Sequence, residues 1–343
     1  MHRGPTSYLK PREGLKSVAI LHAGIATFLQ SPHVAPERSE LRSVGANVAV
    51  LGLPYDSTTV TRPGASHGPR AIRDASSHFS FGAGYHFDYD VTVSDHLKIV
   101  DCGDVDGAPG RAAVTVERAE RALDELYAAG CFPVLLGGDN MTTIPGARAL
   151  ARHLDGPMGF IMFDTHLDTA PDIDGEPLSH CSPVHRVLDL PNVDGSNVVL
   201  VGIHGAANPK YEKDIAEEYG VRVFTVRDVD RLGIDEVARR ALAAASDGTA
   251  GVYLSIDIDV LDGAYVSGTC GPEIGGLTGR EIVRALEIVA AGPICAADCV
   301  EVAPMLDASG NTARVAARLV IDIIAARACR ARDGHPLPSA PRA

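Results

Sequence analysis

The stretch MGFIMFDTHLDT, residues 158–169, decides the fold and carries most of the chemistry of this chain. Its first six residues are apolar without interruption, which is typical of a β-strand buried on both faces, as in parallel sheets. Asp164, His166 and Asp168 follow at alternate positions. Side chains at alternate positions of an extended segment point the same way, so the stretch predicts a polar group at the carboxyl end of a buried strand.

Short apolar runs of this kind recur along the whole chain. Eight of them are expected to form strands, at residues 47–52, 97–102, 132–136, 158–163, 198–201, 221–226, 252–256 and 296–300. Helical patterns lie between most of them, such as 114–129, which ends at Gly130, and 278–290, which opens with Thr278 and Glu281 in capping-box spacing. This alternation predicts parallel strands joined by right-handed crossovers, and therefore a single three-layer α/β/α domain with a mainly parallel sheet of about eight strands.

The two ends of the chain lack this alternation. Residues 1–45 are expected to form an N-terminal arm, 46–333 the α/β/α domain, and 334–343 a C-terminal tail. The apolar run at 17–29 contains His22 and begins well inside the chain, so it is a poor secretion signal, and it is too short for a membrane span. No membrane association is expected.

Composition narrows the environment and the partners. The 343 residues include 31 lysines and arginines against 44 aspartates and glutamates, a formal charge of -13 with no basic block, so nucleic acid is not an expected partner. The seven cysteines are an odd number and form no CxxC pair, which favours a reducing, cytoplasmic location.

Unusual polar residues follow four of the expected strands. In open parallel sheets ligands bind at the carboxyl ends of strands. The residues found there are Asn140 in GGDN, Asp164, His166 and Asp168, then Asp257 and Asp259, and finally Glu301. Four buried aspartates around one imidazole would repel one another unless divalent cations lay between them, and an oxygen-rich set suits manganese, with nickel as an alternative. Taken singly, the DxHxD and DxD motifs are more typical of an acidic turn or a helix N-cap than of a metal site.

Several longer motifs resemble those of the ureohydrolases, the arginase and agmatinase family. They are GLPYDSTTVTRPGASHGPRAIR (52–73), DCGDV (101–105), GGDN (137–140), FDTHLDT (163–169), SIDIDVLD (255–262), GPEIGGLTGRE (271–281) and DCVEVAPMLD (298–307). The segments PEIGGLT, SHCSPVHR (179–186) and GIATFLQSP (24–32) look more like agmatinase and guanidinobutyrase members than like arginase.

The resemblance implies a three-layer fold, a homo-oligomer (trimer or hexamer), and a site for two Mn²⁺ ions, while Ni²⁺ remains the alternative from the donor set. Asp164 and Asp257 look like bridging ligands, Asp168 like a ligand of one ion, and His166 with Asp259 like ligands of the other. Glu301 matches the carboxylate that binds the guanidinium, and His180 a histidine that transfers protons and contacts the substrate. Without the surrounding motifs, Glu301 could be a helix cap and His180 a loop residue.

This chain departs from the family pattern at one important position. Asn140 stands where the family has histidine after GGD, and an amide oxygen is a weaker metal ligand than imidazole. Thr165 replaces the usual alanine, and Cys181 the usual glycine after His180. These changes bear on substrate fit more than on fold.

The expected reaction is metal-assisted hydrolysis of a guanidinium group to urea and an amine, with Asp168 orienting the nucleophile. Agmatine and guanidinobutyrate are favoured as substrates, with guanidine or an alkylguanidine also open. The acidic segment 172–176 would favour agmatine if it faces the pocket, but it could equally be a solvated loop. The alternative is a non-catalytic or regulatory subunit whose metal site is impaired by Asn140 and which assembles with an active paralogue.

Overall fold

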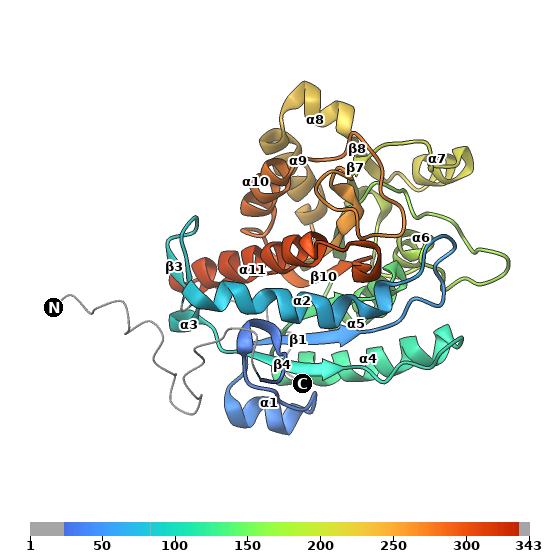
Figure 1. Cartoon of the computed structure of the whole chain (residues 1–343). Helices are drawn as coiled ribbons and strands as arrows, with labels where there is room; N and C mark the ends of the chain where they lie inside the picture. The colour runs from blue at the N-terminus through green and yellow to red at the C-terminus, as the bar shows by residue number, and fades with distance from the viewer. Residues whose placement is uncertain (1–23, 83, 336–343) are drawn as a thin grey trace.

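Eight parallel strands form a central sheet in the computed structural model, which describes residues 24–82 and 84–335 (Figure 1). The strands are β1 (Val48–Leu53), β4 (Ile99–Asp104), β5 (Phe132–Gly137), β6 (Met158–Phe163), β7 (Val198–Ile203), β8 (Arg222–Thr225), β9 (Gly251–Asp257) and β10 (Ile294–Val300). Their order is β4-β1-β5-β10-β9-β6-β7-β8, and every neighbouring pair is parallel. All eight expected strands are therefore confirmed, with small shifts at their ends.

The largest shift concerns β4, which was expected at 97–102 but runs from Ile99 to Asp104. Carboxylates such as Asp101 usually end a buried strand, yet Asp101 is only 1% exposed. Its side chain accepts a hydrogen bond from Arg73 Nε at 2.8 Å, and Arg73 Nη1 donates to Asp104 at 2.6 Å. Because the guanidinium supplies the countercharge, the strand continues through both aspartates.

Helices cover both faces of the sheet. They are α1 (Arg38–Val44), α2 (Gly68–Ser76), α3 (Val93–His96), α4 (Ala112–Ala129), α5 (Thr143–His153), α6 (Pro183–Leu188), α7 (Lys210–Glu218), α8 (Val226–Leu232), α9 (Ile234–Ser246), α10 (Gly279–Val289) and α11 (Asn311–Arg332). The expected helix 114–129 begins two residues earlier and ends at Gly130, which has a left-handed φ of 86°. Helix α10 has Thr278 as N-cap and both hydrogen bonds of the predicted capping box with Glu281. A small hairpin of β2 (Tyr85–His86) and β3 (Val91–Thr92) completes these elements.

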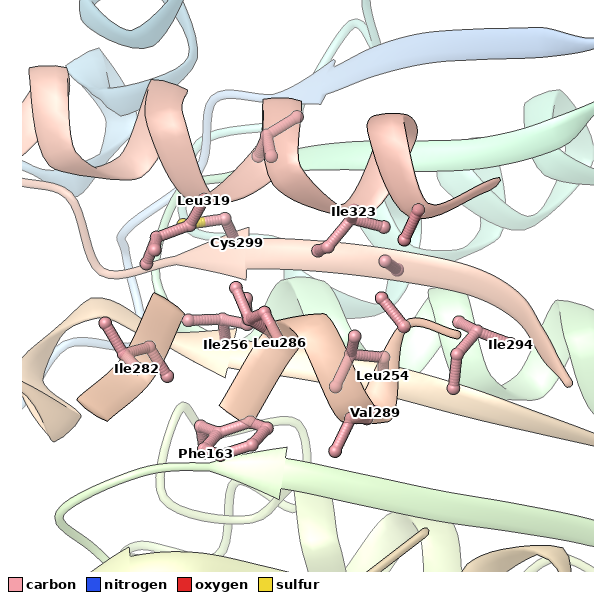
Figure 2. Packing of buried hydrophobic residues seen from close by; sticks show 14 of the residues in the cluster. Phe163, Leu254, Ile256, Ile282, Leu286, Val289, Ile294, Cys299, Leu319 and Ile323 are labelled. Carbon is pink, nitrogen blue, oxygen red and sulfur yellow. The ribbon is translucent and has the colours of Figure 1, made fainter. Parts of the chain in front are cut away.

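The buried side chains form one hydrophobic layer on each face of the sheet. Along β1, Val48 and Val50 belong to the layer that includes α9, α10 and α11, while Ala49 and Leu51 belong to the layer with α1, α4 and α5. Figure 2 shows the first layer, in which Leu286 of α10 packs over the sheet. Full burial of one such leucine contributes roughly 1.5–3 kcal/mol to folding. The predicted three-layer α/β/α architecture is confirmed.

Residues 24–45, part of the expected N-terminal arm, contact the sheet domain. The Phe28 side chain is fully buried and its backbone N–H donates to Asp101 Oδ2 at 2.7 Å, and Leu41 of α1 is also fully buried. Residues 1–23 and 336–343, which include the rest of the arm and most of the tail, lie outside the described residues. Among the helices that the structure describes, none has the length and apolarity needed to cross a membrane.

Candidate active site

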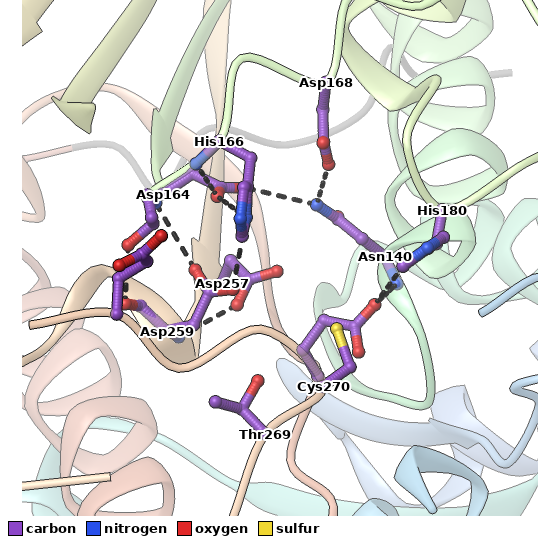
Figure 3. Close-up of polar contacts among 12 residues, drawn as sticks. Asn140, Asp164, His166, Asp168, His180, Asp257, Asp259, Thr269 and Cys270 are labelled. Atoms are coloured by element: carbon purple, nitrogen blue, oxygen red, sulfur yellow. Dashed lines mark hydrogen bonds and ion pairs between the residues drawn. The ribbon is translucent and has the colours of Figure 1, made fainter. Parts of the chain in front are cut away.

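The four central strands β5, β10, β9 and β6 end at the same edge of the sheet, and a polar residue follows or closes each one. This order places side by side strands that are far apart in sequence. Asn140 follows β5 and Glu301 follows β10, and the backbone N–H of Asn140 donates to Glu301 Oε1 at 2.8 Å. The edge therefore gathers all eight candidate residues, which are buried except for the partly exposed His166 (Figure 3): Asn140, Asp164, His166, Asp168, His180, Asp257, Asp259 and Glu301.

Asp164, His166 and Asp259 form one compact cluster, here called the His166 group. His166 Nδ1 lies 3.5 Å from Asp164 Oδ1 and 3.3 Å from Asp259 Oδ2. The potential ligand atoms of the three side chains all lie within 4.8 Å of one another. The Thr165 hydroxyl donates to the Asp259 carbonyl at 2.7 Å, so the threonine that replaces the usual alanine helps to join β6 to the segment after β9.

Asp257, the last residue of β9, lies beneath this group. Its Oδ1 accepts the backbone N–H of Asp259 at 2.9 Å, and its side chain is 2% exposed. Burial raises the pKa of Asp257 well above its ordinary value, and the negative charges of Asp259 and Asp164 raise it further. Among the described residues Asp257 therefore has no positively charged partner, whereas Asp164 and Asp259 have the His166 imidazole close by.

Asn140 and Asp168, here called the Asn140 group, lie on the other side of Asp164. The Asn140 amide nitrogen donates to Asp168 Oδ2 at 2.7 Å and to Asp164 Oδ2 at 3.2 Å. The amide oxygen accepts from Thr143 Oγ1 at 2.9 Å. In this orientation Asn140 presents N–H donors, and not its oxygen, to the two carboxylates. Asp168 has a left-handed φ of 49°, a conformation that costs a non-glycine residue roughly 1–3 kcal/mol.

His180 and Glu301 form a buried pair beside the Asn140 group. His180 Nδ1 lies 3.0 Å from Glu301 Oε1, and the backbone N–H of Val60 donates to His180 Nε2 at 3.1 Å. A donor at Nε2 favours the tautomer that carries its proton on Nδ1, facing Glu301. Glu301 also has a left-handed φ, of 62°, and its Oε2 is buried without a hydrogen-bond partner among the described residues.

The buried carboxylates of the site have pKa values shifted by burial and by one another's charges. A bound cation would relieve this repulsion. Burial raises the pKa of Asp164 to about 7, with a further contribution from the charge of Asp259. Burial also raises the pKa of Asp168 well above its ordinary value, and Asp164 adds to the effect. Burial would likewise raise the pKa of Asp259, but His166 and the hydrogen bonds from neighbouring groups bring it below the ordinary value. Of the His166 group and the Asn140 group, only the His166 group contains a potential countercharge.

These residues fit a pair of divalent ions by the chemistry of their donor atoms. Carboxylate oxygens and one imidazole suit a hard or borderline ion, and buried carboxylates whose pKa is raised by burial are those that a bound cation stabilises. The His166 group has the required proximity. Asn140 is the point of weakest fit, because its amide oxygen faces Thr143 and must exchange places with the nitrogen to bind an ion.

Two further residues of the site were not assigned a role from sequence. Asp139 is fully buried and accepts hydrogen bonds from Thr58 N–H and Oγ1 at 3.1 and 2.7 Å, while its Oδ1 has no partner among the described residues. Cys270 lies against His180 and Glu301, with potential ligand atoms within 4.8 Å. Asp139 belongs to the GGDN motif, so the sequence contained a signal for it. Nothing in the sequence around Cys270 distinguishes it from a core cysteine.

Two glycines explain why the site segments approach so closely. A Cβ at Gly138 would lie 1.9 Å from the Tyr55 carbonyl oxygen, and one at Gly271 would lie 2.9 Å from His166 Cε1. At Gly138 only glycine fits, because the close atom belongs to the backbone, whereas a side chain at Gly271 would displace the His166 ring. Both glycines occur in motifs that carry the family resemblance.

The motifs around the site can now be compared with known proteins. Residues 46–326 match the arginase family. The chain belongs to this family. The predicted resemblance to the ureohydrolases, which are hydrolases of amidine carbon–nitrogen bonds, is confirmed at the level of the family. Members of the family use a binuclear divalent metal centre, typically of manganese.

Individual relatives extend over most of this arginase-family chain. It is similar to guanidinopropionase of Pseudomonas aeruginosa, at 32% identity over 303 residues, 88% of this chain and 91% of that one. It is 32% identical over 285 residues to agmatinase of an Enterobacter species, covering 83% of this chain and 89% of the relative. The structure of proclavaminate amidino hydrolase from Streptomyces clavuligerus superposes with a TM-score of 0.82 at 32% identity, covering 90% of this chain and 99% of that one.

Proposed function

We propose that this chain hydrolyses a small guanidino compound, of the agmatine or guanidinobutyrate type, to urea and an amine. The observation that carries the proposal is the position of two different sets of side chains at one edge of the sheet. The His166 group and its neighbours suit metal ions, and the His180–Glu301 pair suits a planar cation. The relatives named guanidinopropionase and agmatinase support a guanidino substrate.

The residues that would hold two ions are those gathered at the edge. In this proposal Asp164 and Asp257 would be shared by the two ions, Asp168 and Asn140 would hold one ion, and His166 with Asp259 would hold the other. Mn²⁺ is the first candidate and Ni²⁺ the second, because the set is rich in oxygen. When bound, the pair would supply Lewis acidity and an activated water nucleophile.

Glu301 is proposed to bind the substrate guanidinium. Its Oε1 already accepts from the Asn140 N–H and faces His180, so Oε2 is the atom left for the substrate. A buried carboxylate oxygen and a guanidinium N–H form a charge-assisted hydrogen bond. The left-handed backbone of Glu301 and its two contacts at Oε1 hold Oε2 in place.

His180 and Asp168 are proposed to handle the proton and the nucleophile. A substrate bound at Glu301 would lie next to His180 Nδ1, whose proton could pass to the leaving amine. Asp168 Oδ2 accepts from Asn140, which fixes the carboxylate that would orient the attacking water. Both groups are buried, so bulk water does not compete with them.

The part of the substrate beyond the guanidinium would meet groups of both charges, the acidic segment 172–176 and the basic Arg62. The acidic segment 172–176 hydrogen-bonds its own backbone, with Asp172 Oδ1 accepting from Gly175 N–H at 2.8 Å and Glu176 Oε1 from Leu178 N–H at 2.9 Å. Arg62 donates to the carbonyls of Thr269 at 2.7 Å and Cys270 at 3.3 Å. Among the described residues no carboxylate pairs with Arg62, so it favours a carboxylate tail over an ammonium tail.

A kinetic comparison tests the proposal. Urea release by protein loaded with Mn²⁺, and separately with Ni²⁺, is measured with agmatine, guanidinobutyrate, arginine and guanidine. We expect guanidinobutyrate or agmatine to give the highest kcat/KM, and the Arg62→Gln variant to lose more of that value with guanidinobutyrate than with agmatine. Preference for arginine, or no urea from any of the four, contradicts the proposed function.

The alternative function, a non-catalytic subunit, rests on Asn140 alone. This alternative predicts that the site holds no metal and that this chain shows no turnover in the absence of a paralogue. The metal content per chain therefore distinguishes the enzyme from the non-catalytic subunit. We further propose that the protein is a cytoplasmic homo-oligomer, a trimer or hexamer. Light scattering on the purified protein measures the mass, and a monomer would contradict this.

A further inference from the structure

Cys270, His180 and Glu301 form a second cluster of potential metal ligands, here called the Cys270 cluster. Their ligand atoms lie within 4.8 Å of one another. The exposed fractions of the three residues are 8%, 7% and 1%. Figure 3 shows Cys270 below both Asn140 and His180. The cluster therefore lies beside the proposed binuclear centre.

The segment that carries Cys270 is held in place by several contacts. The Cys270 carbonyl accepts from Thr61 Oγ1 and Arg62 Nε, both at 3.3 Å. Two residues earlier, the Gly268 carbonyl accepts from Ala303 N–H at 2.7 Å. These bonds join the segment after β9 to the loop after β1 and to the segment after β10. The thiol is thus positioned by the fold.

The cluster has unused capacity to bind a ligand. Glu301 Oε2 is buried without a hydrogen-bond partner in the part of the chain that the structure describes, which is costly unless something binds there. The Cys270 thiol is free, and it contacts His180. A thiol, an imidazole and a carboxylate together are the donor types of zinc sites, whereas the neighbouring oxygen-rich set suits harder ions.

We propose that Cys270, His180 and Glu301 bind a thiophilic divalent ion of the Zn²⁺ type, separate from the binuclear centre, with a fourth position open to water. Three protein ligands and one open position are a common zinc arrangement. The proposed function assigns His180 and Glu301 to the substrate. An ion bound by the Cys270 cluster and a guanidino substrate therefore exclude each other. Zn²⁺ is then an inhibitor that competes with the substrate, and this consequence rests on the proposed function.

Binding at this place requires two rearrangements of protons. The Cys270 thiol releases its proton, since the thiolate is the ligand. The proton of His180 leaves Nδ1 for Nε2, so Nε2 can no longer accept the hydrogen bond from Val60 N–H. The Val60 side chain is 55% exposed, which leaves this segment room to move. The ion therefore competes with the Val60 contact as well as with the substrate.

A cobalt titration tests the site without measuring turnover. Co²⁺ is added to Mn²⁺-saturated protein, and the sulfur-to-cobalt charge-transfer absorption in the near ultraviolet is followed while bound manganese is measured. We expect one equivalent with this absorption in the natural protein and in Cys181→Ser, a matched control beside His180. Cys270→Ser is expected to lose it and to bind Co²⁺ there at least about 10-fold more weakly. Absence of the band in the natural protein, or its survival in Cys270→Ser, overturns the proposal.

A second measurement needs no variant and covers the case in which Cys270→Ser does not fold. Alkylation of the natural protein is followed by mass spectrometry with and without Zn²⁺. We expect Zn²⁺ to slow alkylation of Cys270 at least about 10-fold and to leave Cys181 unaffected, and equal rates at Cys270 contradict the site. Urea release separates the two proposals: a cobalt–thiolate band without turnover contradicts the proposed function only, and turnover without the band contradicts the Cys270 site only.

Discussion

Asp164 belongs to the His166 group and is contacted by the Asn140 group, and the two sides stabilise this carboxylate in different ways. Asp164 Oδ1 accepts the His166 backbone N–H at 2.6 Å, with the imidazole 3.5 Å away, while Oδ2 accepts from the Asn140 amide at 3.2 Å. An imidazole can carry a positive charge, and an amide cannot. Without metal, one side of the site has a countercharge and the other has only a dipole. The side that most needs a cation therefore has the weaker ligand for it.

The largest expected effect comes from removing the Asp164 carboxylate, which lies between His166 and Asn140 and contacts both. In Asp164→Asn, urea release should fall about 1000-fold or more, because several kcal/mol of metal-derived stabilisation are lost. The melting temperature of the metal-free variant should not fall, since a buried negative charge among other carboxylates is gone. Asp155→Asn, the same change at an exposed aspartate, is the control. Normal metal content and turnover in Asp164→Asn would remove Asp164 from the metal site.

Exchanging the ligand types sharpens the comparison. Asn140→His should raise the affinity for the more weakly bound Mn²⁺ by about 10-fold, because imidazole is the stronger donor. Calorimetric titration of metal-free protein with Mn²⁺ measures the two steps separately. In the reciprocal variant His166→Asn, the tighter step should weaken. If Asn140→His leaves both steps unchanged, Asn140 is not a ligand.

Thr143 is expected to act on the site through Asn140. Its hydroxyl oxygen lies 2.9 Å from both Asn140 Oδ1 and Asp298 Oδ2, and its single proton is donated to one of these acceptors at a time. Thr143→Val leaves the buried Asn140 Oδ1 without this donor, while Asp298 Oδ2 keeps the hydrogen bond from the Tyr253 hydroxyl at 2.8 Å. The free energy of unfolding should therefore fall by about 1–3 kcal/mol.

Thr142→Val is a matched control for this change. The Thr142 hydroxyl is also buried but has no partner among the described residues, so its replacement should cost much less. Denaturant unfolding of both variants compares them. Calorimetry then separates a positioning role from a purely structural one, since only Thr143→Val should also change the weaker Mn²⁺ step. An equal loss of stability in the two variants would contradict the assigned contact.

The fold and most of the site residues could be predicted from local patterns. Unbroken apolar runs such as 158–163 reflect burial on both faces, and that burial depends on the layer architecture alone. Residues at the ends of strands converge by topology, so Asp164 and Glu301 could be placed at one edge before any coordinates. The hydrogen bonds of the Asn140 side-chain amide could not be predicted, because the orientation of its oxygen and nitrogen depends on the groups that they contact. Cys270 was missed because its proposed role depends on contacts with residues about 30 and 90 positions away.

The smallest expected effect lies outside the site, in a motif that was predicted in full. Thr278 Oγ1 accepts from Glu281 N–H at 3.2 Å and Glu281 Oε2 accepts from Thr278 N–H at 2.7 Å, which caps α10. Thr278→Ala should lower the free energy of unfolding by about 1 kcal/mol, through one lost backbone cap. Metal affinity and kcat/KM should not change, because both partners of the motif belong to the same helix end. A change in either would mean that the end of α10 affects the carboxylates of the site, and the metal effects assigned to the His166 and Asn140 groups would then not be local.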